Sequence, residues 1–431
     1  MANNSLRSLV ADLAAGTAAG ASRQSQQRAT HSAAALAEIT DASPERVARQ
    51  PGALPALVAA VAAGSGAAAP KLQAVVANSA YVVSKIASIS PELTRCVAEE
   101  PGALPTLVVV VAAGGATAAP DLQIAARQSA LALGHFTVAS AQLARRVAEE
   151  PGALPVLVAA VAGGAAEAVG KVQGVAMNCA RVLAKMPSNC PELARRVAQE
   201  PGALPGLVAA VAAGGAAAST DVQNLAVNCA AALSAITYAT PELARRVAQE
   251  PGALPALIAA MAAGSAAAAP NLQGVAASSA RALHDMTATG AELARRVAEE
   301  PGALPALVAA TGASRAAASS DVQDAAVSSV GALGDIIEAS PDLARRVAQE
   351  PCALPSFFAA MAAGGAAAAP NLLCVAANGA RAFACITNAA PELARRVAEE
   401  PGVLPALVAA VAAGSTCLLY TSPSPRDNHR N

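Results

Sequence analysis

The chain has few aromatic side chains and almost no net charge. Only 2% of its 431 residues are aromatic, and Trp is absent. Nucleic-acid bases stack on aromatic rings, and the strongest interface anchors are usually aromatic. The formal net charge is −1, so no overall field attracts a polyanion or an anionic membrane. We therefore expect neither nucleic acid nor a membrane surface as partner.

The sequence also has few residues that perform chemistry. We find no P-loop, no dinucleotide-binding fingerprint and no nucleophile elbow. The eight cysteines form no C-x-x-C pair and lie at scattered repeat positions, as expected for small thiols in a reducing compartment. No histidine has metal-ligand spacing; the four are His31, His135, His284 and His429. We expect no catalytic residue, cofactor or metal, and hence no enzyme.

Targeting and membrane signals are weak. The N-terminal stretch MANNSLRSLVADLAAG lacks the basic start and long apolar centre of a signal peptide. The apolar stretches are rich in Ala and Gly and are broken by Pro, short of the roughly 20 apolar residues that span a bilayer. We expect an intracellular protein, cytoplasmic or nuclear, without membrane insertion.

A repeat with a fixed period of fifty residues dominates the sequence. The motif PGALP begins at residue 51 and returns at 101, 151, 201, 251 and 301, then as PCALP at 351 and PGVLP at 401. A fixed period of this length is typical of a solenoid, whose stacked repeats share a core and present a long surface.

One repeat, residues 240–287, predicts three helices. A short helix follows the Thr-Pro-Glu start at 240–242 and ends at the Pro251-Gly252 corner. A second helix has apolar residues at +3, +4 and +7 from Leu254, and the Gly/Ala stretch 262–269 is expected to be a loop. The third helix, about 272–287, has one predicted buried stripe: Leu272, Val275, Ala276, Ser279, Leu283 and Met286.

The block EPGALPALV, followed by VQ and then AL-x-x-I, resembles the armadillo repeat over residues 6–415. The resemblance implies an all-α, right-handed α-solenoid of three-helix repeats, with the third helices lining a concave groove. HEAT-like repeats are the alternative fold. Each repeat is longer than the usual armadillo unit, and the Trp and Asn that many armadillo grooves use for peptide binding are missing.

The expected organisation has four parts. Residues 1–42 form an atypical N-terminal capping repeat, 43–390 seven full repeats and 391–416 a partial eighth. The stretch CLLYTSPSPRD, residues 417–427, resembles a translated sequencing adaptor. We expect residues 417–431 to be a non-native, disordered tail and the natural chain to be longer.

Four columns of the third helix, at offsets +2, +6, +9 and +13 from its start, change chemistry between copies. Helical geometry places them opposite the buried stripe, so we expect them to face solvent. By the resemblance they face the groove. The candidate protein-binding residues are Asn78, Tyr81, Lys85, Gln128, His135, Asn178, Arg181, Lys185, Asn228, Arg281, Asp285, Asp335, Asn378 and Arg381.

Two features of these columns bear on a partner. The +6 column is amide or hydroxyl in every full copy, and such groups hydrogen-bond the backbone of an extended peptide. The +13 column changes from basic to acidic along the chain, which would complement a segment of opposite polarity. Alternatively, the residues at these exposed positions differ between copies because no partner constrains them. Arg281 and Asp285 would, in a further alternative, pair with each other at i, i+4 and stabilise their own helix.

The sequence therefore predicts a non-enzymatic scaffold or adaptor, expected to be a monomer, that binds a protein or extended peptide. One alternative is a nuclear-transport-type adaptor for basic peptides. Another is a repeat segment of a larger, truncated protein. The arginine doublets of the first helices, such as Arg145-Arg146, are expected to be a solvated face whose charge neighbouring Glu residues neutralise.

Overall fold

The computed structural model describes residues 2–65, 70–166, 171–215, 218–265, 269–313, 318–366 and 370–389 together with Arg395. All regular structure in these residues is helical, which confirms the all-α prediction. The partial eighth repeat, Arg395 apart, and the adaptor-like tail lie outside the described residues.

Each full repeat contains three helices of different length, and the capping region 2–42 contributes a second and a third helix. The first helices are α3 (Pro44–Ala48), α6 (Pro91–Glu99), α9 (Ala141–Glu149), α12 (Glu192–Gln199), α15 (Pro241–Gln249), α18 (Ala291–Glu299) and α21 (Pro341–Gln349). The second helices are α1 (Ala2–Thr17), α4 (Ala53–Ser65), α7 (Ala103–Ala113), α10 (Ala153–Ala166), α13 (Ala203–Ala213), α16 (Ala253–Ser265), α19 (Ala303–Gly312) and α22 (Ala353–Ala366). The third helices are α2 (Arg23–Ala42), α5 (Pro70–Ala87), α8 (Pro120–Ala139), α11 (Lys171–Asn189), α14 (Thr220–Ala239), α17 (Pro270–Thr287), α20 (Ser320–Ala339) and α23 (Pro370–Ala389).

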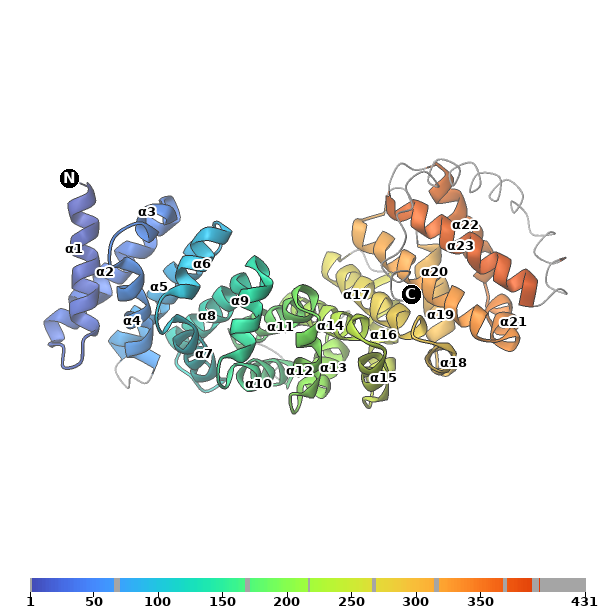
Figure 1. Ribbon diagram of the computed structural model, residues 1–431, viewed down its shortest axis with the longest axis horizontal. Helices are drawn as coiled ribbons and strands as arrows, with labels where there is room; N and C mark the ends of the chain where they lie inside the picture. Colours follow the sequence, from blue (N-terminus) through green and yellow to red (C-terminus); the bar gives the residue numbers. More distant parts are fainter. Residues whose placement is uncertain are drawn as a thin grey trace, which may run out of the picture. The chain divides into compact units, whose positions relative to one another are not determined.

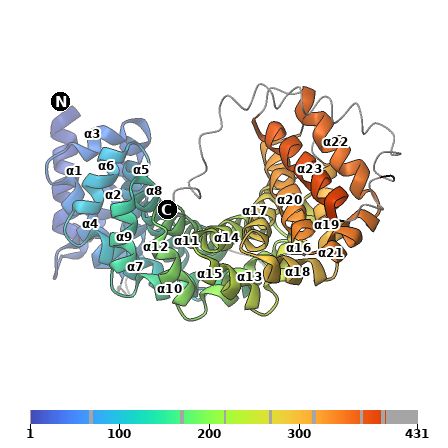
Figure 2. The ribbon, with the colours of Figure 1, turned by 45° about the vertical axis from the view of Figure 1, so that its right-hand side comes forward.

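The contacts divide the chain into two compact units. The first contains Met1–Gly214 and Ala218–Ala239, and the second continues from Thr240. Within the first unit, α2, α5, α8, α11 and α14 pack side by side in chain order, and α1, α4, α7, α10 and α13 form a parallel row (Figure 1). Within the second unit, α17, α20 and α23 make the equivalent row (Figure 2).

The Pro-Gly motif forms the corner between the first and second helices. Gly102 has a φ of 79°, in the left-handed region that glycine enters without steric cost. Across this corner the chain turns by 87° between α6 and α7. The corner expected from the repeated motif is confirmed, and Cys352 is the described non-glycine residue with positive φ, at 65°.

The predicted helical faces are also confirmed. The Thr240 hydroxyl accepts a hydrogen bond from the Leu243 N–H, which caps α15. Leu254, Leu257, Ile258 and Met261 are buried on α16. On α17, the whole predicted stripe of six residues is buried.

The expected loop after the second helix was placed too early. α16 stays helical through Ser265 instead of fraying from Ala262. The reason is packing, because Gly264 lies against α17, where an added Cβ would come within 2.1 Å of the Leu272 carbonyl oxygen. Gly264 thus allows α16 and α17 to approach each other closely.

Candidate functional site

Three of the seven members of the +6 column are buried instead of facing solvent as expected. Gln128 and Asn178 are only 6% and 5% exposed, and Ser328 is also buried. Asn178 Nδ2 donates to the Arg127 carbonyl at 3.2 Å, and the Ser84 hydroxyl donates to Gln128 Oε1 at 2.8 Å. The expectation that these side chains hydrogen-bond a peptide is therefore wrong for Gln128 and Asn178.

The cause is the spacing of the third helices. A third helix packs against the second helix of its own repeat and also against the third helices of the adjacent repeats. Less of its surface is therefore exposed to solvent than on a helix that has a single buried stripe. The +6 position points at the neighbouring third helix. Asn78, Asn228 and Asn378 are half-buried, and Asn228 Nδ2 bonds the Asn224 carbonyl of its own helix at 2.9 Å.

On α5, two candidate residues bind the capping repeat. The Tyr81 hydroxyl donates to Asp41 Oδ1 on α2, and this hydrogen bond is the main reason that the pKa of Tyr81 is raised. Lys85 Nζ lies 4.0 Å from the same carboxylate oxygen. Asp41 therefore offsets the positive charge that Lys85 would otherwise present.

The next two third helices carry a group that we call the basic cluster: Arg127 and His135 on α8, and Arg181 and Lys185 on α11. Arg127 and Lys185 are exposed, while His135 and Arg181 are half-buried. Among the described residues, none of the four takes part in an ion pair with an acidic side chain. Burial, with a smaller effect of the charge on Arg181, lowers the pKa of His135.

Contacts between α8 and α11 hold the stem of Arg127 in place. A Cβ added at Gly174 would lie 2.8 Å from Arg127 Cδ, so the aliphatic stem crosses α11 where the glycine leaves room. Sequence reasoning missed Arg127 because its column was not among the four. The sequence feature that could have identified it is that Arg127 is the one charged residue at a repeat position that is otherwise Ala, Met or Val.

Apolar side chains continue this face. Val138 lies three residues after His135 near the end of α8 and is 46% exposed. Tyr238 has the same repeat position at the end of α14 and is 73% exposed. A helical spacing of three places Val138 on the same side of α8 as His135. The basic cluster therefore has accessible apolar groups beside it, which sequence analysis did not single out.

In the second unit, the carboxylate of the acidic candidate Asp335 contacts side chains of neighbouring repeats and is therefore largely unavailable to a partner. Its side chain is 13% exposed and accepts a hydrogen bond from Thr287 Oγ1 of α17 at 3.0 Å. Arg381 Nη2 of α23 lies 3.1 Å from Asp335 Oδ1, and His284 Nε2 lies 3.6 Å from Oδ2. Asp335 thus connects three successive third helices.

The other charged candidates of this unit also pair across helices. Arg381 Nε donates to Glu338 Oε1 at 2.8 Å, and this hydrogen bond is the largest contribution lowering the pKa of Glu338. Arg281 Nη2 lies 3.9 Å from Asp324 Oδ2 of α20. Asp285 is half-buried. The expected acidic end of the surface is therefore largely neutralised by neighbouring repeats.

The arginine doublets have a structural role that the sequence did not reveal. In three of the five doublets within the described residues, the second arginine donates to a backbone carbonyl near the end of the preceding first helix: Arg146 to Ala98 at 3.0 Å, Arg196 to Ala148 at 2.8 Å and Arg346 to Ala298 at 3.1 Å. Such bonds satisfy carbonyls that a helix end leaves open. The first arginine of one doublet, Arg145, forms an ion pair with Glu192 of the next repeat.

The described residues contain no group of three or more His, Cys, Asp or Glu side chains able to hold a metal ion. No single described helix has both the length and the apolar character of a membrane span.

Comparisons with known proteins relate the chain to others by fold alone. No protein-family model matches the chain, and no curated protein sequence matches it. An engineered protein of known crystal structure aligns with a TM-score of 0.50 at 22% identity, covering 66% of this chain and 98% of its own. The crystal structure of Uso1-2 aligns with a TM-score of 0.56 at 9% identity, covering 91% of this chain and 62% of that one. These similarities support an all-helical, solenoid-like array.

Proposed function

We propose that this chain is a non-enzymatic, armadillo-type scaffold whose first unit binds an acidic, extended protein segment along its third helices. The observation that carries the proposal is the basic cluster of Arg127, His135, Arg181 and Lys185. Its permanent charges, those of Arg127, Arg181 and Lys185, are on adjacent helices and lack acidic partners among the described residues, whereas the comparable charges of the second unit are paired. The lowered pKa of His135 leaves that side chain largely neutral at pH 7, where it offers a polar contact.

The chemistry of the cluster selects the partner. Unpaired cations on a fixed surface attract carboxylates and repel basic segments, and steer association in a salt-dependent way. Val138, 46% exposed, gives the same face an apolar contact. The repulsion argues against the nuclear-transport alternative, in which the groove would accept a basic peptide.

Two charge reversals test the proposal. Arg181→Glu and Lys185→Glu together should weaken binding of a fluorescent Glu/Asp-rich peptide by about tenfold at low salt, as measured by anisotropy. Arg195→Glu is the matched control, because Arg195 is exposed on first helix α12 of the same unit. Unchanged affinity in the double variant, or equal binding of a Lys/Arg-rich peptide, would refute the proposed site.

A further inference from the structure

A second concave site lies away from the third helices, in the N-terminal capping region. It has a volume of about 800 Å³ and is lined by residues of α1, α3 and the segments that flank α3. Leu6 is among the lining residues but is only 1% exposed, so the accessible apolar side chain is that of Ile89, which is 40% exposed. A cavity of this size is in the range that holds a ligand or a short peptide.

The cavity coincides with a shortened helix. From Ser43 to Pro51 there are three fewer residues than from Ser140 to Pro151, and α3 has five residues where α9 has nine. The extra turn of α9 contains Leu143 and Ala144, which are both buried. In α3 the described buried residue is Val47, so the space that such a turn fills elsewhere is open here.

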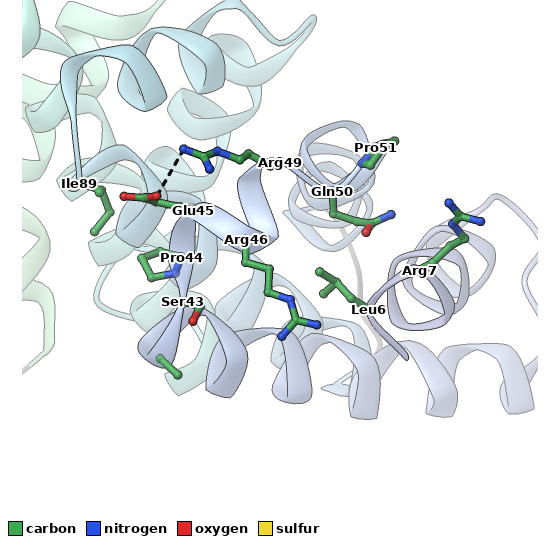
Figure 3. A pocket seen from close by; sticks show the side chains of 11 residues that line it. Leu6, Arg7, Ser43, Pro44, Glu45, Arg46, Arg49, Gln50, Pro51 and Ile89 are labelled. Atoms are coloured by element: carbon green, nitrogen blue, oxygen red, sulfur yellow. Dashed lines mark ion pairs between the residues drawn. The ribbon is translucent and has the colours of Figure 1, made fainter. Parts of the chain in front are cut away.

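The same region has a different charge from the other repeats. Arg49-Gln50 replaces the Glu149-Glu150 pair that precedes the Pro-Gly corner. Arg7 and Arg46 also line the cavity, against one acidic residue, Glu45. Figure 3 shows Arg49 turned toward Glu45, with a 3.4 Å ion pair. Both side chains of that pair are more than half exposed, and such pairs contribute little and exchange easily.

We propose that this cavity binds a short acidic segment of a partner protein through an aliphatic anchor. The anchor, a leucine-like side chain, occupies the space left by the missing turn, beside Ile89. The flanking carboxylates pair with Arg7 and Arg49. The positive charge around the cavity favours an acidic segment over a basic one. The space left by the missing turn, which buried Leu and Ala side chains fill in other repeats, favours an apolar anchor over a wholly polar segment. The site is separate from the third-helix surface and does not depend on the function proposed for it.

The test uses the full chain carrying Arg181→Glu and Lys185→Glu, which removes the third-helix site proposed for acidic segments, and three fluorescent peptides of equal length. The first carries two leucines flanked by Glu and Asp, the second replaces the leucines with Ser, and the third replaces the acids with Lys. The affinity of the first peptide should exceed that of the second by about tenfold or more, because burying a leucine side chain contributes at least the binding free energy that corresponds to this ratio. The Lys peptide should not bind.

Three variants place the binding in this cavity. Arg7→Glu and Arg49→Glu together should weaken the first peptide about tenfold, while Arg23→Glu, an exposed arginine of α2 outside the cavity, should leave its affinity within twofold. Inserting Leu-Ala-Arg between Glu45 and Arg46 should restore the missing turn and abolish binding. Circular dichroism checks that each variant remains helical.

Several results would overturn the proposal. In that background, peptide binding that survives the insertion, or that Arg7→Glu and Arg49→Glu leave unchanged, would place the binding outside this cavity. Competition by inorganic phosphate at peptide-like concentrations would show an anion site without an anchor. A monomer–dimer shift on insertion, seen by sedimentation velocity, would make a second copy of the chain the occupant.

Discussion

Adjacent glycines in α10 should respond in opposite ways to the same substitution. A Cβ added at Gly163 would meet nothing within 4 Å. A Cβ added at Gly164 would lie 2.2 Å from Ala176 Cβ on α11 and 3.5 Å from Leu225 Cδ2 on α14. Carbon atoms pack at about 3.5–4.0 Å, so Gly164→Ala forces the second and third helices of the repeat apart.

The expected magnitudes follow from these contacts. Both substitutions gain about 0.5–1 kcal/mol, because glycine is a poor residue inside a helix. Gly164→Ala also carries an overpacking cost of about 1–3 kcal/mol. Since the helical gain is common to both variants, the difference between them isolates the steric cost. The Gly163→Ala variant should be more stable than the original chain by about 0.5–1 kcal/mol, and the Gly164→Ala variant less stable by up to about 2.5 kcal/mol.

Urea unfolding followed by circular dichroism gives the order of the two midpoints. Repeat arrays need not unfold in two states, so amide hydrogen exchange in α10 and α11 should localise the effect. Ala176→Gly in the Gly164→Ala background removes the opposing Cβ and should recover part of the loss. Equal stabilisation by both glycine substitutions would refute the close contact between these helices.

Three further predictions concern single side chains. Cys352 has a φ of 65°, a conformation that costs a non-glycine residue about 1–2 kcal/mol. Cys352→Gly should therefore raise the midpoint of urea unfolding, and a lowered midpoint would contradict backbone strain at this corner. Ser129 Oγ is buried without a hydrogen-bond partner among the described residues, so Ser129→Ala should stabilise the chain by about 1 kcal/mol in urea unfolding; a loss of stability would reveal a partner for that hydroxyl. Because burial lowers the pKa of His135 in the folded state, the unfolded state binds more protons near pH 6.5, and stability should decrease as pH falls through about 6.5. His135→Gln should reduce that decrease in pH-dependent urea midpoints, and an unchanged pH profile would argue against the shift.

The sequence predicted the features that depend on local geometry and on the repeat period. The fifty-residue period and the Pro-Gly motif located the corner whose glycine has positive φ. Helical spacing identified the buried faces of α16 and α17 correctly, including the small residue Ser279. These features need only residue type, spacing and backbone preference, all of which one repeat contains.

The candidate surface depended on contacts between repeats, which spacing within one helix does not specify. Helical phase alone placed Asn178 toward solvent, but the neighbouring third helix lies close enough to bury it. The same spacing made Asp335 a candidate contact for a partner, whereas Arg381, Thr287 and His284 from adjacent helices surround its carboxylate. The +6 and +13 columns are thus partly interior because the distance between neighbouring third helices decides which side chains reach the next helix. Only the tertiary structure therefore separated the basic cluster, which has no acidic partner in the part of the chain that the structure describes, from the charges that hold neighbouring repeats together.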